Sequence, residues 1–126
     1  MITLGAERKQ LDIVNDQIGC PTYAQDIARA IIWIIPQLNS SNKSGIYHYC
    51  GYRQCSWYDF ATIIFQIAKS YKLTTPKILS SVKTTKLPAK RPMHSALNCS
   101  KIEKEFGVTT SNWEQGIDKA IVRLKK

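Results

Sequence analysis

The chain has 126 residues, a length that fits one domain able to bury a core without a disulfide or metal staple. Its 44% hydrophobic and 10% aromatic content argues against a disordered chain. No run approaches the roughly 18 consecutive apolar residues of a membrane-spanning helix, so no membrane partner is expected. The N-terminus lacks the layout of a secretory signal, and a cytoplasmic location is therefore expected.

The formal net charge is +9, and the excess of positive charge is concentrated in one part of the chain. Between Phe60 and Ile102 there is no Asp or Glu, whereas basic residues recur there: Lys69, Lys72, Lys77, Lys83, Lys86, Lys90, Arg91 and Lys101. A field of one sign attracts anions such as phosphorylated small molecules, nucleic acid or acidic membrane. The alternative is a solvated lysine-rich face that only keeps the protein soluble. Charge alone does not choose between these alternatives.

The first elements follow from local patterns. Residues 1–9 have the character of the end of a helix, and residues 11–14 (LDIV) alternate as a short strand does. Thr22 and Gln25 have the spacing of a capping box, which predicts a helix over about residues 23–35. The second half of that helix is apolar nearly all round, which predicts burial on more than one side.

The middle of the chain predicts a strand followed by a helix. Residues 45–50 (GIYHYC) are rich in β-forming residues and predict a buried strand, which favours a core role for His48 over a role as a base. Ser56 is suited to capping the next helix, with Asp59 in its first turn, where the helix dipole favours an anion. Apolar residues then keep a helical period to about Tyr71.

The last third predicts one more strand, a loop and two helices. The strand falls at residues 77–82, and residues 87–96 form a loop held extended by two prolines. A short helix over residues 100–106 ends at a glycine, and a second capping box, Ser111 with Glu114, starts the final helix. The order of elements is typical of an α/β chain with too few strands for a complete doubly wound domain.

Several kinds of chemistry are missing from the sequence. The six glycines include no dinucleotide-binding or P-loop spacing, and none of the six tyrosines has a lysine four residues later. The four cysteines are expected to be reduced and inert. His48, Cys50 and Cys55 lack the second ligand pair that zinc sites usually show. We therefore assign no catalytic, cofactor-binding or metal-binding residue.

The positive candidate is the run Lys90–Arg91–Pro92 in the basic loop braced by Pro88 and Pro92, and its central residue is Arg91. Its planar guanidinium suits a pair of phosphates, and the prolines reduce the conformational entropy that the loop loses on binding. The alternative is an arginine that packs on an aromatic ring or pairs with a carboxylate. The residues by themselves leave both roles open.

Four segments carry longer motifs: VNDQIGCPTYAQDIARAI (14–31), GIYHYCGYRQCSWYDFA (45–61), RPMHSALNCSKIEKEFGV (91–108) and NWEQGI (112–117). They resemble, in the same order, segments of the dTDP-4-dehydrorhamnose reductases, which are extended short-chain dehydrogenases/reductases. Together they cover nearly the whole chain, and we regard the resemblance as specific.

The resemblance implies that residues 1–126 are a single domain, the C-terminal substrate-binding part, with helices packed on a small, incomplete sheet. Such enzymes reduce dTDP-4-dehydro-L-rhamnose to dTDP-L-rhamnose with NADPH, for bacterial surface polysaccharide. Their glycine-rich cofactor loop and catalytic Tyr/Lys pair lie in an N-terminal Rossmann part that this chain lacks. The chain alone is therefore expected to be inactive and to bind no cofactor, with the Rossmann part as its partner.

The resemblance also suggests individual roles. The family's Arg-Pro pair begins at Arg91, which implies a contact with the substrate diphosphate, and Gln17 is expected to face the nucleotide from a strand-exit turn. His94 stands where the family has Asn, so an amide contact is not carried over. Some members hold Mg²⁺ with glutamates at a dimer contact. The matching residues here are Gln25 and Arg123, so neither the magnesium nor that dimer is expected.

Two alternatives remain open: a small basic nucleic-acid-binding module, and a truncated remnant without a function of its own. Against the first, the helical spacing of Trp57, Phe60 and Ile64 indicates core residues rather than a platform for stacking bases. A domain separated from its Rossmann partner is further expected to expose apolar surface near residues 31–35 or Tyr47, and hence to self-associate.

Overall fold

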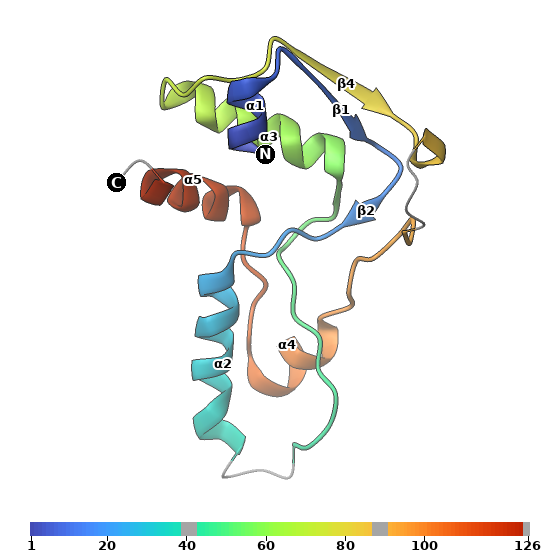
Figure 1. The fold of residues 1–126 in the computed structure, drawn as a ribbon. Helices are drawn as coiled ribbons and strands as arrows, with labels where there is room; N and C mark the ends of the chain where they lie inside the picture. Colours follow the sequence, from blue (N-terminus) through green and yellow to red (C-terminus); the bar gives the residue numbers. More distant parts are fainter. Residues whose placement is uncertain (39–42, 87–90, 125–126) are drawn as a thin grey trace.

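The structure, a computed structural model, describes residues 1–38, 43–86 and 91–124. Within these residues the fold is mixed α/β, as the sequence predicts (Figure 1). The strands form two small two-stranded sheets, where the family resemblance implied one small, incomplete sheet. The elements are α1 (Ile2–Glu7), β1 (Gln10–Val14), β2 (Ile18–Gly19), α2 (Ala24–Leu38), β3 (Cys55–Ser56), α3 (Trp57–Ser70), β4 (Ile78–Val82), a 3₁₀ turn (Thr84–Lys86), α4 (Ser100–Phe106) and α5 (Trp113–Leu124). In this part of the chain, no helix has the length and apolar character needed to cross a membrane.

The main core lies between the first sheet and helices α3 and α5. Strands β1 and β4 pair in parallel, from Gln10 opposite Ile78 to Val14 opposite Val82. A parallel pair needs a long crossover, and α3 lies in the chain that connects the two strands. Ala61 and Ala68 of α3 are completely buried. The rest of this core is apolar: Leu11, Ile64, Phe65, Trp113, Ile117 and Ile121.

The second sheet brings three distant segments together. Strands β2 and β3 pair antiparallel, with Ile18 opposite Ser56. On its other side Ile18 pairs with the loop after residue 91: its N–H donates to the Met93 carbonyl at 2.8 Å, and its carbonyl accepts from the Ser95 N–H at 2.8 Å. Residues 17–19 therefore lie between the start of α3 and the arginine-bearing loop.

A second apolar cluster joins α2 to α4 at the other end of the molecule (Figure 1). It contains Ala30, Cys50, Cys99, Ile102, Phe106 and Val108. Helix α4 ends at Gly107, whose φ of 64° is in the left-handed region that favours glycine. The predicted helix and its glycine stop are both confirmed.

The predicted buried strand over residues 45–50 is wrong. This segment forms no strand, and its Ile46 side chain is 79% exposed. His48 is also exposed, so the predicted core role is wrong as well. The β-forming composition is present, but in the described part of the chain no second strand pairs with this segment.

The prediction for the second half of α2 is also wrong. Ile31, Ile32, Trp33 and Ile35 are 53–69% exposed, and the helix continues through Pro36 to Leu38. This exposure confirms the expectation of open apolar surface at residues 31–35. At the other expected place the exposed side chain is Ile46, whereas Tyr47 is half-buried.

The two capping boxes predicted for α2 and α5 are replaced by longer-range contacts. The Thr22 hydroxyl donates to the Cys20 carbonyl at 3.1 Å and accepts from the Gly51 N–H at 3.0 Å. The Ser111 hydroxyl donates to the Asp26 carboxylate at 2.6 Å. At α5 the Glu114 N–H donates instead to the Asn112 side chain at 2.9 Å. Among the three predicted helix starts in the described residues, the reciprocal box is found at α3.

Candidate functional site

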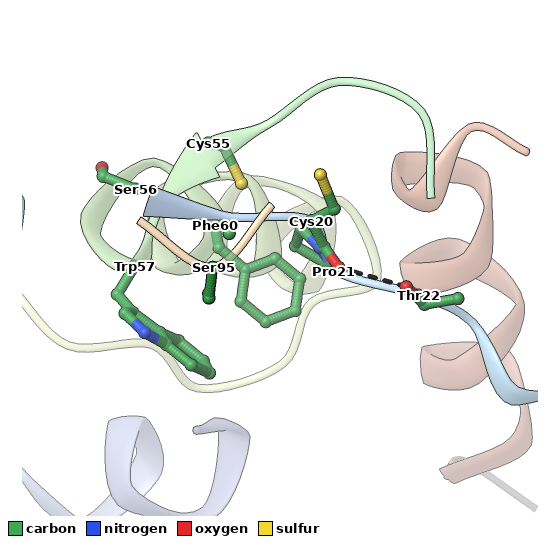
Figure 2. A pocket seen from close by; sticks show the side chains of 9 residues that line it. Cys20, Pro21, Thr22, Cys55, Ser56, Trp57, Phe60 and Ser95 are labelled. Atoms are coloured by element: carbon green, nitrogen blue, oxygen red, sulfur yellow. Dashed lines mark hydrogen bonds between the residues drawn. The ribbon is translucent and has the colours of Figure 1, made fainter. Parts of the chain in front are cut away.

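A pocket of about 340 Å³ lies where β2, β3 and the start of α3 meet (Figure 2). Two stretches of the chain, 19–22 and 55–60, form most of it, and the loop after residue 91 contributes Ser95. The lining residues are Gly19, Cys20, Pro21, Thr22, Cys55, Ser56, Trp57, Phe60 and Ser95. The opening motif of the family resemblance therefore forms one side of this pocket and the C-S-W motif forms the other.

Aromatic rings form one wall of the pocket (Figure 2). Trp57 and Phe60 meet edge to face with ring centroids 6.0 Å apart, and Phe60 meets Trp113 in the same way at 5.6 Å. Trp113 is buried, so it holds Phe60 in place from behind. Trp57 is 43% exposed, so the prediction that it belongs to the core is wrong. A half-exposed indole beside a cavity can pack against a flat or apolar part of a ligand.

The polar side chains of the pocket are bound to the protein itself. Ser56 and Asp59 cap α3 reciprocally, and the Ser95 hydroxyl donates to the Ile18 carbonyl at 3.2 Å. Burial raises the pKa of the Cys55 thiol to about 11, so this thiol is protonated at neutral pH. None of the described lining residues pairs a nucleophile with a base. The arrangement is suited to binding rather than to proton transfer.

Gln17 lies beside this pocket but does not line it. Gln17 is only 3% exposed, and its side-chain amide donates to the Thr84 hydroxyl at 3.1 Å. The same Thr84 donates its N–H and hydroxyl to the Asp16 carboxylate, the hydroxyl at 2.6 Å. These bonds hold the pKa of Asp16 below its usual value, the hydroxyl bond being the main cause. The observed contacts of Gln17 are thus structural, and connect the end of β1 to the turn after β4.

Arg91 is exposed at the start of the described part of the loop. No described aromatic ring or carboxylate contacts its guanidinium, so the alternative roles considered above have no partner in this part of the structure. The Met93 and His94 main chain lies against Ile18, next to Gln17. The structure therefore brings the two predicted segments together, although it shows no contact between the Arg91 and Gln17 side chains. Lys90 lies outside the described residues.

His94, which stands in place of the family's Asn, binds a neighbour. Its ring Nε2 lies 2.9 Å from the Gln54 side-chain oxygen, on the surface. Gln54 directly precedes Cys55, so this contact ties the loop to the approach to β3. Neither His94 nor Gln54 is among the residues that line the pocket.

Gln25 and Arg123 do not fit a magnesium site. In the amide orientation that satisfies both side chains, the Gln25 oxygen accepts from the Arg123 guanidinium, with Nη1 at 3.1 Å. A neutral amide and a permanent cation replace the carboxylates that Mg²⁺ requires. The described residues also contain no cluster of three potential metal ligands.

The sequence analysis missed the pocket because its lining comes from segments that are more than 30 residues apart along the chain. The one sequence feature that could have indicated the pocket was the position of Trp57. A tryptophan directly after a helix-capping serine lies in the first turn, where a side chain is easily exposed.

Comparison with known proteins supports the family resemblance that the motifs indicate. The family model described as RmlD substrate binding domain matches residues 1–126. A dTDP-4-dehydrorhamnose reductase of Aggregatibacter actinomycetemcomitans is 39% identical over 122 residues, which cover 93% of this chain and 42% of the relative. The corresponding protein of Escherichia coli K12 is 32% identical, over 98% of this chain and 43% of the relative.

Solved structures give the same result. A dTDP-4-dehydrorhamnose reductase from Clostridium acetobutylicum superposes with a TM-score of 0.84 at 31% identity, over 99% of this chain and 42% of that one. The Bacillus anthracis reductase, solved in complex with NADP, gives 0.75 at 30% identity, over 97% and 40%. This chain thus spans about two-fifths of the length of these relatives. Since the family model matches throughout, the chain belongs to the RmlD substrate-binding domain family.

Proposed function

We propose that this chain is the nucleotide-sugar-binding part of a dTDP-4-dehydrorhamnose reductase, and that its ligand is a dTDP-sugar. The observation that carries the proposal is the aromatic-walled pocket beside Ile18, flanked by the loop that bears Arg91, in a chain that matches the family from end to end. The reductases of known sequence and structure are named for the same substrate.

In this proposal the two sides of the site bind different parts of the ligand. Arg91, exposed and without a described partner, binds the diphosphate through its planar guanidinium. Trp57 and Phe60 pack against a ring of the ligand. The basic stretch between Phe60 and Ile102 attracts the anionic ligand over a longer range.

The reduction itself needs NADPH, which supplies a hydride, and a proton donor. The described residues of the pocket contain neither a glycine-rich loop nor a free acid, so this chain does not fit the cofactor. We assign the cofactor and the catalytic pair to an N-terminal part, as in the longer relatives. The chain alone is then expected to give no NADPH oxidation with the keto-sugar.

The proposed contact surface for that N-terminal part is the exposed face of α2 together with residues 45–50. Ile32, Trp33 and Ile35 are all exposed within about one turn of this helix. The neighbouring segment has β-forming residues and lacks a strand partner in the described structure. An added sheet would pair with this segment and cover the helix face, which would satisfy both features.

Titration calorimetry with dTDP-L-rhamnose tests the ligand. We expect binding to the 126-residue chain, and a loss of roughly 10- to 100-fold in Arg91→Ala, because charge-assisted bonds to the diphosphate are removed. Arg8→Ala is the matched control, since Arg8 is also exposed and lies at the opposite end of β1 from the site. Absence of binding by the unsubstituted chain, or equal losses in the two variants, would refute the proposal.

The net charge of +9 and the exposed Trp57 also favour a second candidate, a nucleic-acid-binding module. Such binding would grow with oligonucleotide length and weaken steeply with salt. Competition separates the two functions. A dTDP-sugar that displaces labelled dTDP while a long oligonucleotide does not supports the nucleotide-sugar site.

A further inference from the structure

Two buried thiols touch each other in the cluster between α2 and α4. The Sγ atoms of Cys50 and Cys99 lie 3.5 Å apart, and the two residues are 6% and 8% exposed. Both cysteines are free. They come from segments 49 residues apart in the chain, so folding alone places them in contact.

Neighbouring hydrogen bonds hold the two sulfur atoms in position. Both thiols point to the Leu97 carbonyl, with Sγ–O distances of 3.7 Å from Cys50 and 3.9 Å from Cys99. Cys99 is the residue before α4, and the residue after Cys50 is Gly51, whose N–H donates to Thr22. A side chain at Gly51 would clash with the Pro21 carbonyl, since a Cβ there would lie 2.1 Å from that oxygen. The main chain beside Cys50 is therefore packed closely against Pro21, and the main chain at Cys99 leads directly into α4.

A cavity of about 330 Å³ reaches this pair. Cys50 and Cys99 both line it, and so does Cys20, which is only half-buried. Arg53 and Ser100 contribute polar atoms to the same cavity. A small polar reagent can thus approach the sulfur atoms without unfolding of the protein.

We propose that Cys50 and Cys99 form a redox-active dithiol, which a low-molecular-weight disulfide of the glutathione type converts into an intramolecular disulfide. In the first step one cysteine thiolate attacks the reagent's disulfide, and a mixed disulfide forms as one reduced thiol leaves with a proton. In the second step the other cysteine attacks the mixed disulfide, and the second reduced thiol leaves with the second proton. The protein loses two electrons and the reagent gains them.

The contact distance makes the second step fast relative to the first. The attacking sulfur is already beside its target, so the reaction is intramolecular and has a high effective concentration. Bond formation needs the two sulfur atoms to approach by roughly 1.5 Å, to the usual length of about 2.05 Å. Burial raises the pKa of both thiols, so little thiolate is present at neutral pH and the first attack is slow. The protein must therefore be equilibrated with the disulfide reagent rather than exposed to it briefly.

This site is independent of the proposed nucleotide-sugar function, since neither sulfur atom lines the aromatic-walled pocket. It concerns the stability of the α2–α4 end. A disulfide there would join the start of α4 to the end of the 45–50 segment and close a long loop, which restricts the unfolded chain.

The test is peptide mapping of the 126-residue chain after equilibration in glutathione redox buffers. Trypsin places each cysteine in a separate peptide: Cys20 in 10–29, Cys50 in 44–53, Cys55 in 54–69 and Cys99 in 91–101. We expect peptides 44–53 and 91–101 to become linked, and the oxidised protein to melt roughly 5 to 10 °C above the reduced protein. Cys55 should stay unlinked at the same buffer ratio.

Three variants serve as controls. Cys55→Ser should keep the linked peptides and the thermal shift, whereas Cys50→Ser and Cys99→Ser should lose both and carry glutathione on the remaining thiol. The mapping of the unsubstituted protein stands even where a variant folds poorly. Unlinked peptides throughout the redox series would overturn the proposal. A link between peptides 10–29 and 44–53 would also overturn it, because the reactive pair would then be Cys20 with Cys50.

Discussion

Cys55 lies in the wall of the pocket, where burial raises the pKa of its thiol from 9.0 to about 11, with the nearby Asp59 carboxylate adding to the effect. The folded state therefore favours the protonated thiol more strongly than the unfolded chain does. The stabilisation linked to this proton is fully present below about pH 9. It is lost as the pH rises through the interval up to about 11.

We therefore expect the free energy of unfolding to fall between pH 9 and 11, and to fall less in Cys55→Ala. Urea denaturation at a series of pH values measures both slopes. Below about pH 8 the free energies of unfolding of the two proteins should differ by a constant amount, which is the cost of removing the thiol side chain. Parallel curves over the whole range would show that the thiol of Cys55 is not perturbed by its surroundings.

At the scale of elements, the start of α3 depends on one reciprocal pair. The Ser56 hydroxyl accepts from the Asp59 N–H at 3.0 Å, and the Asp59 carboxylate accepts from the Ser56 N–H at 3.1 Å. Ser56→Ala removes the hydroxyl at a site only 4% exposed, and we expect a loss of about 1 kcal/mol in the free energy of unfolding.

Ser70→Ala is the control for that measurement, because Ser70 lies at the exposed end of the same helix and its hydroxyl donates within the helix, to the Ile67 carbonyl. It should change stability by a few tenths of a kcal/mol. Asp59→Ala should cost about as much as Ser56→Ala, and the double variant less than the sum. Additive losses would mean that the two groups do not act as one cap.

Which elements the sequence predicted depends on the range of the interactions that fix them. Helices α3 and α4 follow from a cap, a period and a glycine stop, all within a few residues, and were predicted within one or two residues. The capping boxes at Thr22 and Ser111 failed because each hydroxyl bonds across the fold, to Gly51 and Asp26. The same reason explains the missing strand over 45–50, which needs a partner that local composition does not supply.

The candidate site shows the same limit. Family motifs gave Arg91 and Gln17 substrate-facing roles, which stay predictions. The structure pairs the main chain of Ile18, the residue after Gln17, with Met93 in the loop that bears Arg91. The motifs did not indicate that the Gln17 amide is buried against Thr84, or that Trp57 faces the cavity. Side-chain direction is set by tertiary packing, and a one-dimensional motif does not contain it.

At the scale of the whole molecule, the most unusual feature is a helix with its apolar side uncovered. In α2, Ile31, Ile32, Trp33 and Ile35 are each more than half exposed, although Trp33 also donates its indole N–H to the Phe106 carbonyl at 2.9 Å. Exposed apolar side chains gathered in one helix favour association, because their burial removes nonpolar area from water. The net charge of +9 opposes association at low salt.

We therefore expect the chain to self-associate as its concentration and the salt concentration rise, through the exposed face of α2. Ile32 is the best place to test this surface, since it is 69% exposed and forms part of neither apolar cluster. Ile32→Lys should weaken association by about 10-fold or more, as burial of a charge opposes contact. Sedimentation velocity over a concentration series measures the effect.

Leu124→Lys is the matched control, because Leu124 is 72% exposed on α5 and the substitution adds the same charge. If the added charge alone prevents association, the two variants should self-associate equally weakly, and α2 would not be the contact surface. If only Ile32→Lys yields monomers, the contact is local to α2. A concentration-independent monomer for the unsubstituted chain would contradict the expectation and would mean that the positive charge outweighs the apolar face.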